Sequence, residues 1–491
     1  MVFSPHIFIF YFLALSLAAY YALYGAPQRW RNFILIILGY AFYGWAGPLF
    51  MGLMFGTTFI DWLVSLVIAH DTWNVWNARH EPVLRLLEGG LRSKTQKRAI
   101  TISIIANLTV LGFFKYFNFG VDSYNALAHS LGLENRQWDT FFRVILPLGI
   151  SFYTFQAMSY TLDVYRGEAR AMRNFVDFSC FVSMFPHLVA GPILKFSYLA
   201  DQLEGRTLTM EKFARGAAFF ALGLTKKILL ANPAGKVADL TFNAGSVGFS
   251  DSWYGAISYA FQIYFDFSAY SDMAIGLGLM LGFIFAKNFD SPYQSASITE
   301  FWRRWHISLS SWLRDYLYIP LGGNRKGELR TYANLMLTML LGGLWHGASW
   351  NYVIWGGIHG SMLAFERHQG KRGFFTRLPR PLQISLTFLI VVFAWVFFRA
   401  RNLPTALAYC QSMLGFGHPQ PGEGLIAGVI YQPYYVWSIA IAAVITWAGV
   451  QTWDWTRTIT TPKTAVIFIL FWISLLVMTT QSYNPFIYFI F

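Results

Sequence analysis

Residues 382–398 read LQISLTFLIVVFAWVFF and contain no ionisable side chain. A run of this length and composition predicts an α-helix that crosses the hydrocarbon core of a bilayer, which is about 30 Å thick. Similar apolar runs recur along the chain, at roughly 7–24, 33–47, 49–69, 100–118, 142–162, 176–194, 212–231, 253–285, 333–364, 382–398, 434–450 and 464–480. The run at 7–24 lacks a basic start and a small-residue cleavage site, so we interpret it as a retained first helix.

The composition agrees with this reading. The 491 residues are 55% hydrophobic and 19% aromatic, and only 12% are charged, against about 25% in soluble domains. A soluble enzyme, a disordered protein and a disulfide scaffold are therefore excluded. Cys180 and Cys410 show no paired spacing, so neither a disulfide framework nor a cysteine-ligated metal is indicated. We predict an all-α polytopic membrane protein of about 11–13 transmembrane helices, forming one domain over 1–491.

The basic residues lie mainly between the apolar runs. The net charge of +13 would suggest nucleic acid in a soluble protein, but here the positive-inside rule and anionic lipid explain it. One orientation places the basic loops on the cytoplasmic side, as the positive-inside rule requires. These loops are 28–31, 70–98, 163–175, 366–380 and 451–463. Both termini are then expected outside the cytoplasm.

The number of crossings is inconsistent between residues 175 and 366. Five candidate pieces lie there, whereas two cytoplasmic flanks require an even number of crossings. At least one piece must be re-entrant or interfacial, and the candidates are 176–194, which contains Pro186 and Pro192, and the amphipathic stretch 298–319. Irregular backbone at membrane depth is tolerated only where protein or a water-filled cavity surrounds it.

Polar side chains inside the apolar runs are concentrated in the same region. Gln262, Asp266 and Tyr270 follow one helix face at i, i+4 and i+8, and Ser268 and Asp272 form a second i, i+4 pair. One interpretation is interhelical hydrogen bonding that holds the bundle together. The other is a polar wall that lines a substrate passage or orients a catalytic imidazole.

The amphipathic stretch ITEFWRRWHISLSSWLRDYLYIPLGGNR covers 298–325. Its polar sector consists of Arg303, Arg304, His306, Ser310 and Arg314. An interfacial helix with its arginines at the headgroups would explain this pattern. Alternatively, the arginines hold an anionic cosubstrate and His306 takes part in proton transfer.

His346 lies in TMLLGGLWHGASWNYVIWGGIHG at 338–360, a membrane-long run without charges. It could be a hydrogen-bonded packing residue. It could also be a general base, because a neutral imidazole is the least costly base to keep at low dielectric. His359 would lie about 220° further around a regular helix and so off the face of His346. We therefore assign it only a supporting position behind the site.

Over these residues the chain resembles the membrane-bound O-acyltransferases, in particular the branch that acetylates alginate, peptidoglycan and cellulose. The matching text is YFDFSAYSDMAIGLGLMLGF at 264–283, SITEFWRRWHISLSSWLRDYLYIPLGGNR at 297–325, LLGGLWHGASWNYVIWGGIHG at 340–360 and FPHLVAGPI at 185–193. The resemblance implies transmembrane, re-entrant and interfacial helices around a central tunnel, with a catalytic core at about 255–365. It also implies two functional histidines, His306 and His346.

The resemblance further implies an O-acetyltransferase of the bacterial inner membrane. Its donor would be acetyl-CoA on the cytoplasmic side, with no permanently bound cofactor and no metal. Its partner would be a periplasmic SGNH-hydrolase-like acetyltransferase, and its final acceptor a polysaccharide such as alginate. Peptidoglycan or cellulose is the alternative acceptor, and a transporter, export subunit or assembly scaffold is the alternative class.

These expectations combine into one mechanistic hypothesis. His346 acts as general base, and either His306 or the N–H groups near Gly342–Gly343 stabilise the oxyanion. The residues expected to line the tunnel or contact substrate are Gln262, Asp266, Tyr270, Asp272, Ser310, Trp345 and His359. The residues expected to bind the donor's phosphates are Arg303, Arg304, Arg314, Arg325 and Lys326.

Overall fold

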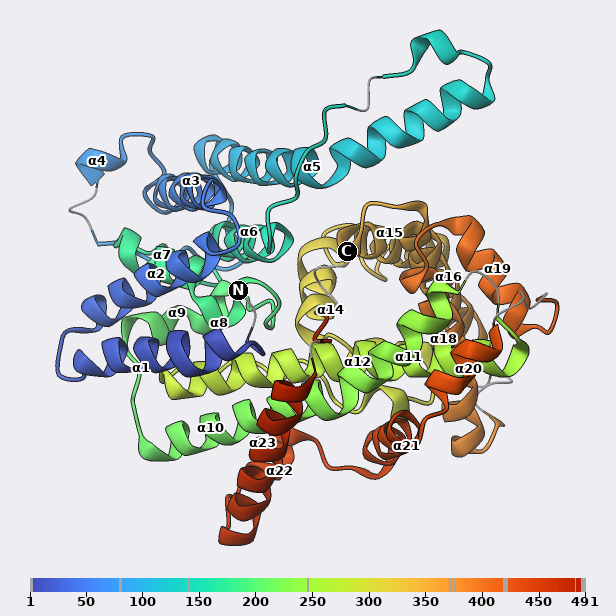
Figure 1. Cartoon of the computed structure of the whole chain (residues 1–491). Coiled ribbons are helices and arrows are strands. Elements are labelled where there is room, and N and C mark those ends of the chain that lie inside the picture. Colours follow the sequence, from blue (N-terminus) through green and yellow to red (C-terminus); the bar gives the residue numbers. More distant parts are fainter. Residues whose placement is uncertain are drawn as a thin grey trace. The chain divides into compact units, whose positions relative to one another are not determined.

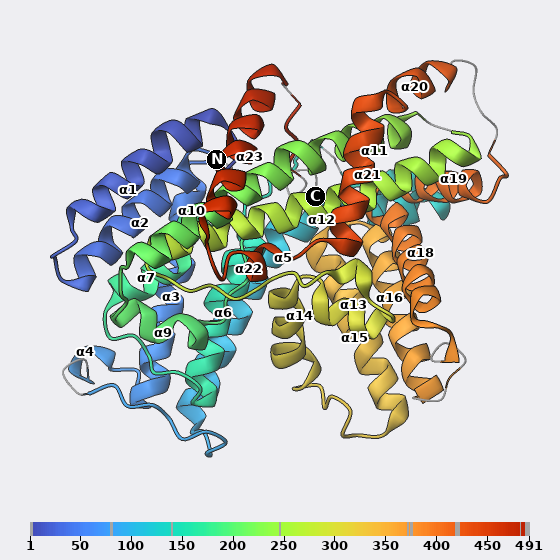
Figure 2. The same ribbon diagram turned by 90° about the horizontal axis from the view of Figure 1, so that it is seen from below.

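The fold is taken from a computed structural model of the chain, which describes residues 3–78, 82–138, 141–244, 247–370, 373, 377–417, 423–481 and 483–486. Within these ranges all regular structure is helical (Figures 1 and 2). Parts of the basic loops, 79–81, 371–372 and 374–376, lie outside the described residues, as do 1–2 and 487–491. The sidedness of the termini therefore stays a prediction.

The chain forms two compact units, and each is described by itself. The first comprises Met1–Met210 and Leu281–Phe285. Its elements are η1 (Ile7–Phe12), α1 (Leu13–Ala22), α2 (Gln28–Gly44), α3 (Phe50–His70), α4 (Val75–Ala78), α5 (Lys94–Ser130), η2 (Glu134–Arg136), α6 (Ile150–Arg166), α7 (Phe175–Ser183), α8 (Phe185–Leu188) and α9 (Phe196–Glu204).

The second unit comprises Glu211–Met280 and Ala286–Phe491. Its first elements are α10 (Met210–Thr225), η3 (Lys226–Ala231), α11 (Asn232–Asn243), α12 (Phe249–Met280), η4 (Pro292–Gln294), α13 (Ile298–Arg304), α14 (Ile307–Leu313) and η5 (Arg314–Tyr318). The remaining elements are α15 (Glu328–His346), α16 (Trp350–Gln369), α18 (Arg380–Arg399), α19 (Leu403–Met413), α20 (Glu423–Ile430), α21 (Pro433–Ala448), α22 (Thr452–Trp455) and α23 (Thr461–Thr480).

Several helices have the length and hydropathy needed to cross a bilayer. Four described helices qualify by length and composition, namely α3, α5, α18 and α23, and Ile7–Ala22 and α21 are shorter apolar helices. The predicted all-α fold with membrane-length apolar helices is confirmed. The number of crossings, the central tunnel and the single-domain organisation stay predictions.

The two segments expected to be irregular are both broken. The run 176–194 is split into α7 and the short α8, with Met184 extended between them and Pro186 in the first turn of α8. The stretch 298–319 is split into α13, α14 and the π-helical η5, with the break at Trp305 and His306. Both lie in the region where the crossings could not be counted evenly.

The run 333–364 was interpreted as one segment, and this is wrong. It forms two helices, α15 and α16, which lie side by side in Figure 2 and are separated at residues 347–349. Glycine permits their close packing, since a Cβ on Gly343 would lie 2.1 Å from the carbonyl oxygen of Tyr352. His346 and His359 are therefore on different helices, and the angular argument that separated them does not apply.

Two of the predicted cytoplasmic segments contact each other in the first unit. The Nε of Arg85 donates to the carbonyl of Gly167, and the Nε of Arg92 donates to the carbonyl of Tyr165, each at 2.5 Å. Segments 70–98 and 163–175 thus meet at one end of α3, α5 and α6. This contact agrees with their placement on one side of the membrane.

An aromatic core organises the second unit. Trp305, Trp355 and Trp395 are almost fully buried, and the Trp395 ring centroid lies 5.1 Å from that of Trp305 and 5.6 Å from that of Trp355. The Trp395 indole donates to the Tyr293 hydroxyl at 3.1 Å, and that hydroxyl donates to the carbonyl of Ala260 at 2.7 Å. Aromatic pairs of this kind contribute about 0.5–1.5 kcal/mol each beyond burial. The core fixes α12, α13, α16 and α18 around the histidines described next.

Candidate active site

His306 has an unusual backbone conformation between α13 and α14. Its φ of 42° and ψ of 55° place it in the left-handed region, which costs a non-glycine residue about 1–2 kcal/mol. Two hydrogen bonds hold this turn: Ser310 N–H donates to the His306 carbonyl and Ile307 N–H donates to the Asn288 carbonyl, both at 2.9 Å. Backbone strain of this kind is concentrated at functional sites.

Asn288 fixes the orientation of the His306 imidazole. Its Oδ1 lies 3.2 Å from His306 Nδ1 and 3.2 Å from the backbone nitrogen of Ser308. A backbone N–H can only donate, so the atom facing it must be the amide oxygen rather than the amide nitrogen. His306 Nδ1 must then carry the proton, and Nε2 keeps its lone pair.

The rest of the Asn288 side chain is also bonded. The Ser308 hydroxyl donates to Oδ1 at 2.8 Å, and Nδ2 donates to the Ser271 hydroxyl at 2.9 Å. Asn288 is 1% exposed, so these bonds are shielded from water and are costly to break. The amide therefore acts as a rigid support that selects one tautomer of His306.

The His306 ring is buried among aromatic side chains. The side chain is 0% exposed, and Nε2 makes no hydrogen bond with any described residue. Phe267 stands edge-on to the ring at a centroid distance of 4.6 Å, and Phe289 lies at 6.5 Å. A buried nitrogen with an unused lone pair is suited to accept a proton from a bound group.

His346 supplies the second imidazole. It is the last residue of α15 and is 9% exposed. Its ring centroid is 6.4 Å from that of His306, 5.4 Å from Trp355 and 5.2 Å from Phe398. Two hydrogen bonds in series, each about 2.8 Å long, fit this spacing. One oxygen atom of a substrate can thus contact both rings in a site walled by aromatic side chains.

His359 lies outside this pair. Its Nδ1 accepts from the Trp302 indole at 3.3 Å, and its ring is 4.9 Å from Trp355, which also contacts His346. Trp355 therefore lies between the two histidines. This location agrees with the supporting position predicted for His359, although the route to that prediction was wrong.

The two aspartates of α12 are paired with consecutive lysines. Asp266 lies 2.8 Å from the Nζ of Lys227, both almost fully buried, and Asp272 lies 2.7 Å from the Nζ of Lys226. Lys227 also donates to the carbonyl of Pro485. These ion pairs join α12 to η3 and to segment 483–486. This arrangement matches the interpretation in which the aspartates hold the bundle together.

The other residues expected to line the tunnel have mixed surroundings. Gln262 packs against α11, where a Cβ on Gly235 would lie 2.7 Å from its Nε2. The Tyr270 ring packs at a tilt against Phe486, with the ring centroids 4.8 Å apart. Trp345 contacts the histidine pair through its ring, at 5.0 Å from His346 and 6.2 Å from His306.

The polar side chains of 298–326 are dispersed among different partners. Arg304 pairs with Glu300 at 2.8 Å, Arg314 pairs with Asp315 at 2.7 Å, and the Ser310 hydroxyl donates to the carbonyl of Trp305 at 3.2 Å. The remaining basic side chains of the set are exposed and make no hydrogen bond or ion pair with another described residue: Arg303, Arg325 and Lys326. Their role in donor binding stays a prediction.

The glycine amides do not fit the oxyanion role expected of them. Gly342 and Gly343 lie inside α15, where backbone N–H groups are engaged by helical hydrogen bonds. Their contribution is steric, as the close approach of α15 to α16 shows.

Sequence reasoning missed Asn288 and the lysine pair. Asn288 precedes His306 by eighteen residues and lies in an irregular segment, and its contact with His306 depends on the left-handed turn. Lys226 and Lys227 could have been noticed, because they are adjacent charges at the end of the apolar run 212–231. Two cations at that depth require carboxylate partners.

The helical fold and the membrane-length apolar helices are those of a polytopic membrane protein, and the paired imidazoles form its candidate active site. The sequence profile of the membrane-bound O-acyltransferase family matches residues 91–403, and the chain belongs to that family. It is therefore an O-acyltransferase and a multi-pass membrane protein, which confirms the predicted enzyme class over a transporter or scaffold.

Three relatives are similar to this chain over most of their length. The chain is 45% identical to a probable alginate O-acetylase of Pseudomonas putida, covering 100% of both chains. It is 48% identical to a probable alginate O-acetylase of Azotobacter vinelandii, over 85% of this chain and 79% of the relative. It is 35% identical to a peptidoglycan O-acetyltransferase of Helicobacter pylori, over 84% and 80%.

Proposed function

We propose that the chain moves acetyl groups from acetyl-CoA at the cytoplasmic face of a bacterial inner membrane toward a polysaccharide outside it, with alginate as the final acceptor. The similarity to probable alginate O-acetylases over 100% of the chain supports this acceptor. Peptidoglycan is the second candidate, supported by the similarity to the Helicobacter pylori enzyme. Cellulose remains a further alternative predicted from the sequence.

The observation that supports the chemistry best is the oriented His306 beside His346. In the proposed reaction, Nε2 of His306 accepts the proton of the attacking hydroxyl as its oxygen bonds to the thioester carbonyl carbon. The tetrahedral intermediate then collapses, the C–S bond breaks, and the thiolate leaves with the proton returned by the imidazolium. General base catalysis of this kind contributes about 10²–10⁴-fold.

His346 is assigned to the carbonyl oxygen of the thioester. Its ring lies 6.4 Å from His306, so a reacting group between the two rings can contact both. A hydrogen bond donated by His346 would stabilise the negative charge that develops on that oxygen. This assignment exchanges the roles predicted from the sequence, and it rests on the tautomer that Asn288 selects.

Donor and partner binding complete the proposal. Arg303, Arg325 and Lys326 are exposed cations and are the candidates that remain available for the phosphates of acetyl-CoA. A periplasmic SGNH-hydrolase-like acetyltransferase would receive the acetyl group and transfer it to the polysaccharide. The basic loops would face the cytoplasm, and both termini the periplasm.

The chemistry can be tested with purified chain in vesicles that enclose labelled acetyl-CoA. We expect His306→Ala and His346→Ala each to abolish transfer to a hydroxyl acceptor, while His368→Ala, an exposed histidine of α16, stays at the wild-type rate. Hydroxylamine then separates the roles, because it attacks without prior deprotonation. It should restore turnover to His306→Ala and not to His346→Ala.

Two results would contradict the proposal. If His306→Ala lost transfer to the hydroxyl acceptor and transfer to hydroxylamine to the same extent, His306 would not be the general base. If His306→Ala and His346→Ala both acetylated the acceptor at the wild-type rate, the two histidines would not form the active site. The acceptor is tested separately, by supplying alginate, cellulose or peptidoglycan together with the periplasmic partner, and release of labelled ester from only one of them identifies it.

A further inference from the structure

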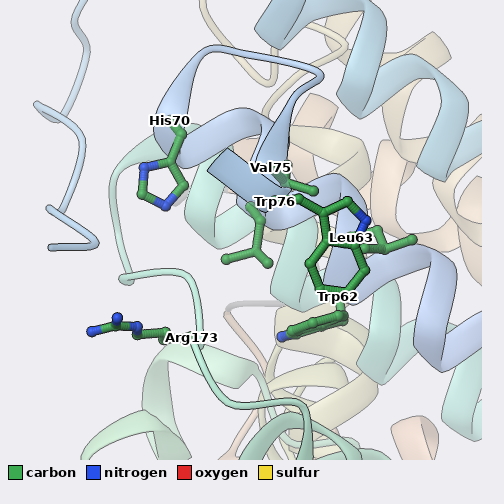
Figure 3. Close-up of a pocket in the computed structure, with 7 residues that line it drawn as sticks. Trp62, Leu63, His70, Val75, Trp76 and Arg173 are labelled. Atoms are coloured by element: carbon green, nitrogen blue, oxygen red, sulfur yellow. The ribbon is translucent and has the colours of Figure 1, made fainter. Parts of the chain in front are cut away.

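The first unit contains a cavity that the acetyl-transfer site does not use. It has a volume of about 210 Å³ and lies at the end of α3 (Figure 3). Seven residues line it: Trp62, Leu63, Leu66, His70, Val75, Trp76 and Arg173. In Figure 3 the side chains of His70 and Arg173 lie on one side and the indoles of Trp62 and Trp76 on the other. The cavity is therefore basic on one wall and aromatic on the other.

Hydrogen bonds and a sharp turn hold the residues around the cavity in place. The Trp62 indole donates to the carbonyl of Met172 at 2.9 Å, which positions the residue before Arg173. Asp71 has a φ of 54°, so the chain turns sharply after His70. The Asp71 carboxylate accepts from the Ser93 hydroxyl. Arg173 and His70 are thus brought together from segments about a hundred residues apart in the chain.

Both polar groups of the basic wall lack a protein partner. The Nε2 of His70 is buried and makes no hydrogen bond within the described part of the chain. The exposed Arg173 guanidinium forms no ion pair or hydrogen bond with any residue of the described ranges. The lining residues include no carboxylate. A buried imidazole nitrogen next to an uncompensated cation is suited to an anionic oxygen.

The position of the cavity at the end of a membrane-length helix indicates that its anion is a lipid headgroup. His70 is the last residue of α3, one of the helices long and apolar enough to span. A cavity at the end of such a helix lies at headgroup depth, where tryptophan side chains are enriched. The same region contains the basic segments 70–98 and 163–175, which are predicted to face the anionic cytoplasmic leaflet.

We propose that this cavity binds the phosphate of an anionic phospholipid, with Arg173 and His70 on the phosphate oxygens. The indoles of Trp62 and Trp76 and the side chains of Leu63 and Leu66 would contact the glycerol and upper acyl chain. A free phosphate, including that of a soluble nucleotide, offers the same oxygens but has no apolar part to fill the aromatic wall. The lipid is therefore the ligand that uses the whole cavity.

The test uses a photoactivatable phosphatidylglycerol whose reactive group is near the glycerol, added to the purified full-length chain in neutral detergent micelles. Crosslinked peptides are then mapped by mass spectrometry. We expect labelling within 62–78 or 167–175. Arg173→Gln should reduce it by about tenfold or more, as expected for the loss of one charge-assisted contact. Arg173→Lys should retain most of it.

A matched control is available three residues away. Arg170 is also exposed but pairs with Glu204 at 3.4 Å, so Arg170→Gln should leave labelling unchanged. Unlabelled phosphatidylglycerol should compete, whereas phosphatidylcholine and inorganic phosphate should not. Equal competition by phosphatidylcholine, or full labelling of Arg173→Gln, would overturn the anion site. Full competition by millimolar inorganic phosphate would overturn the assignment to lipid.

Discussion

Replacing Asn288 should impair catalysis without preventing folding, because its amide selects the tautomer of His306. In Asn288→Leu, His306 Nδ1 and the Ser308 amide lose the oxygen that accepts from them at 3.2 Å. An unmet buried N–H costs about 1–3 kcal/mol. Without the Asn288 oxygen, the His306 tautomer that is protonated on Nδ1 and has Nε2 free to accept a proton is destabilised by this amount. The active tautomer is then less populated, so kcat should fall about 5- to 150-fold.

Comparing different substitutions of Asn288 shows whether its amide acts on the His306 tautomer or only supports the fold. Asn288→Asp keeps an oxygen that can accept from His306 Nδ1 and should retain more activity than Asn288→Leu. Ser271→Ala removes only the group that accepts from Asn288 Nδ2 at 2.9 Å and should change kcat less than fivefold (about one lost neutral hydrogen bond).

The assay is initial-rate acetyl transfer in vesicles with the hydroxyl acceptor and with hydroxylamine, alongside thermal unfolding of each variant. Asn288→Leu should lower kcat with little change in KM, and its deficit should shrink with hydroxylamine. If Asn288→Leu turned over at the wild-type rate, or if Asn288→Asp were as impaired as Asn288→Leu, then the tautomer argument would be refuted.

Three further outcomes are expected. Lys227→Met leaves the buried Asp266 carboxylate uncompensated, so the free energy of unfolding should fall by about 3–5 kcal/mol; replacing both residues by apolar ones should recover part of it, and denaturant unfolding would show whether it does. Gly343→Val forces a side chain against a carbonyl 2.1 Å away, so the variant should insert poorly or melt early, and an unchanged melting temperature would argue against the close α15–α16 contact. Arg303→Gln should raise the KM for acetyl-CoA at constant kcat if that exposed guanidinium binds donor phosphate. Arg304→Gln breaks the ion pair with Glu300 and should mainly lower stability. Kinetics and melting curves on both variants separate these effects.

The sequence was informative where chemistry and periodicity coincide. A histidine inside an uncharged membrane-long run is conspicuous, and this made His346 a candidate. His306 stood in a short polar sector of a tryptophan-rich stretch, and the structure brings the two rings within 6.4 Å. The break at Met184 could be anticipated from Pro186, because proline is tolerated in the first turn of a helix but not in its interior.

The missed features depend on contacts that no local pattern encodes. The break between α15 and α16 falls at Gly347–Ser349, and glycine and serine are tolerated inside membrane helices. Asn288 lies outside any periodic segment, so its pairing with His306 follows from tertiary structure alone. Donor-phosphate residues were chosen by charge, and the carboxylates that neutralise Arg304 and Arg314 could be identified only from the fold.

The buried Lys227 also has a consequence for the order in which the protein is made. Its ammonium group contacts Pro485 as well as Asp266, and the Asn232 side chain donates to the carbonyl of Tyr483 at 3.2 Å. Tyr483 and Pro485 are synthesised some 250 residues after Asn232 and Lys227, which they contact. During translation, η3 and α12 must therefore wait in the membrane with an incomplete polar contact. A chain truncated before residue 483 would lack the carbonyl partners that Lys227 and Asn232 have in the complete fold.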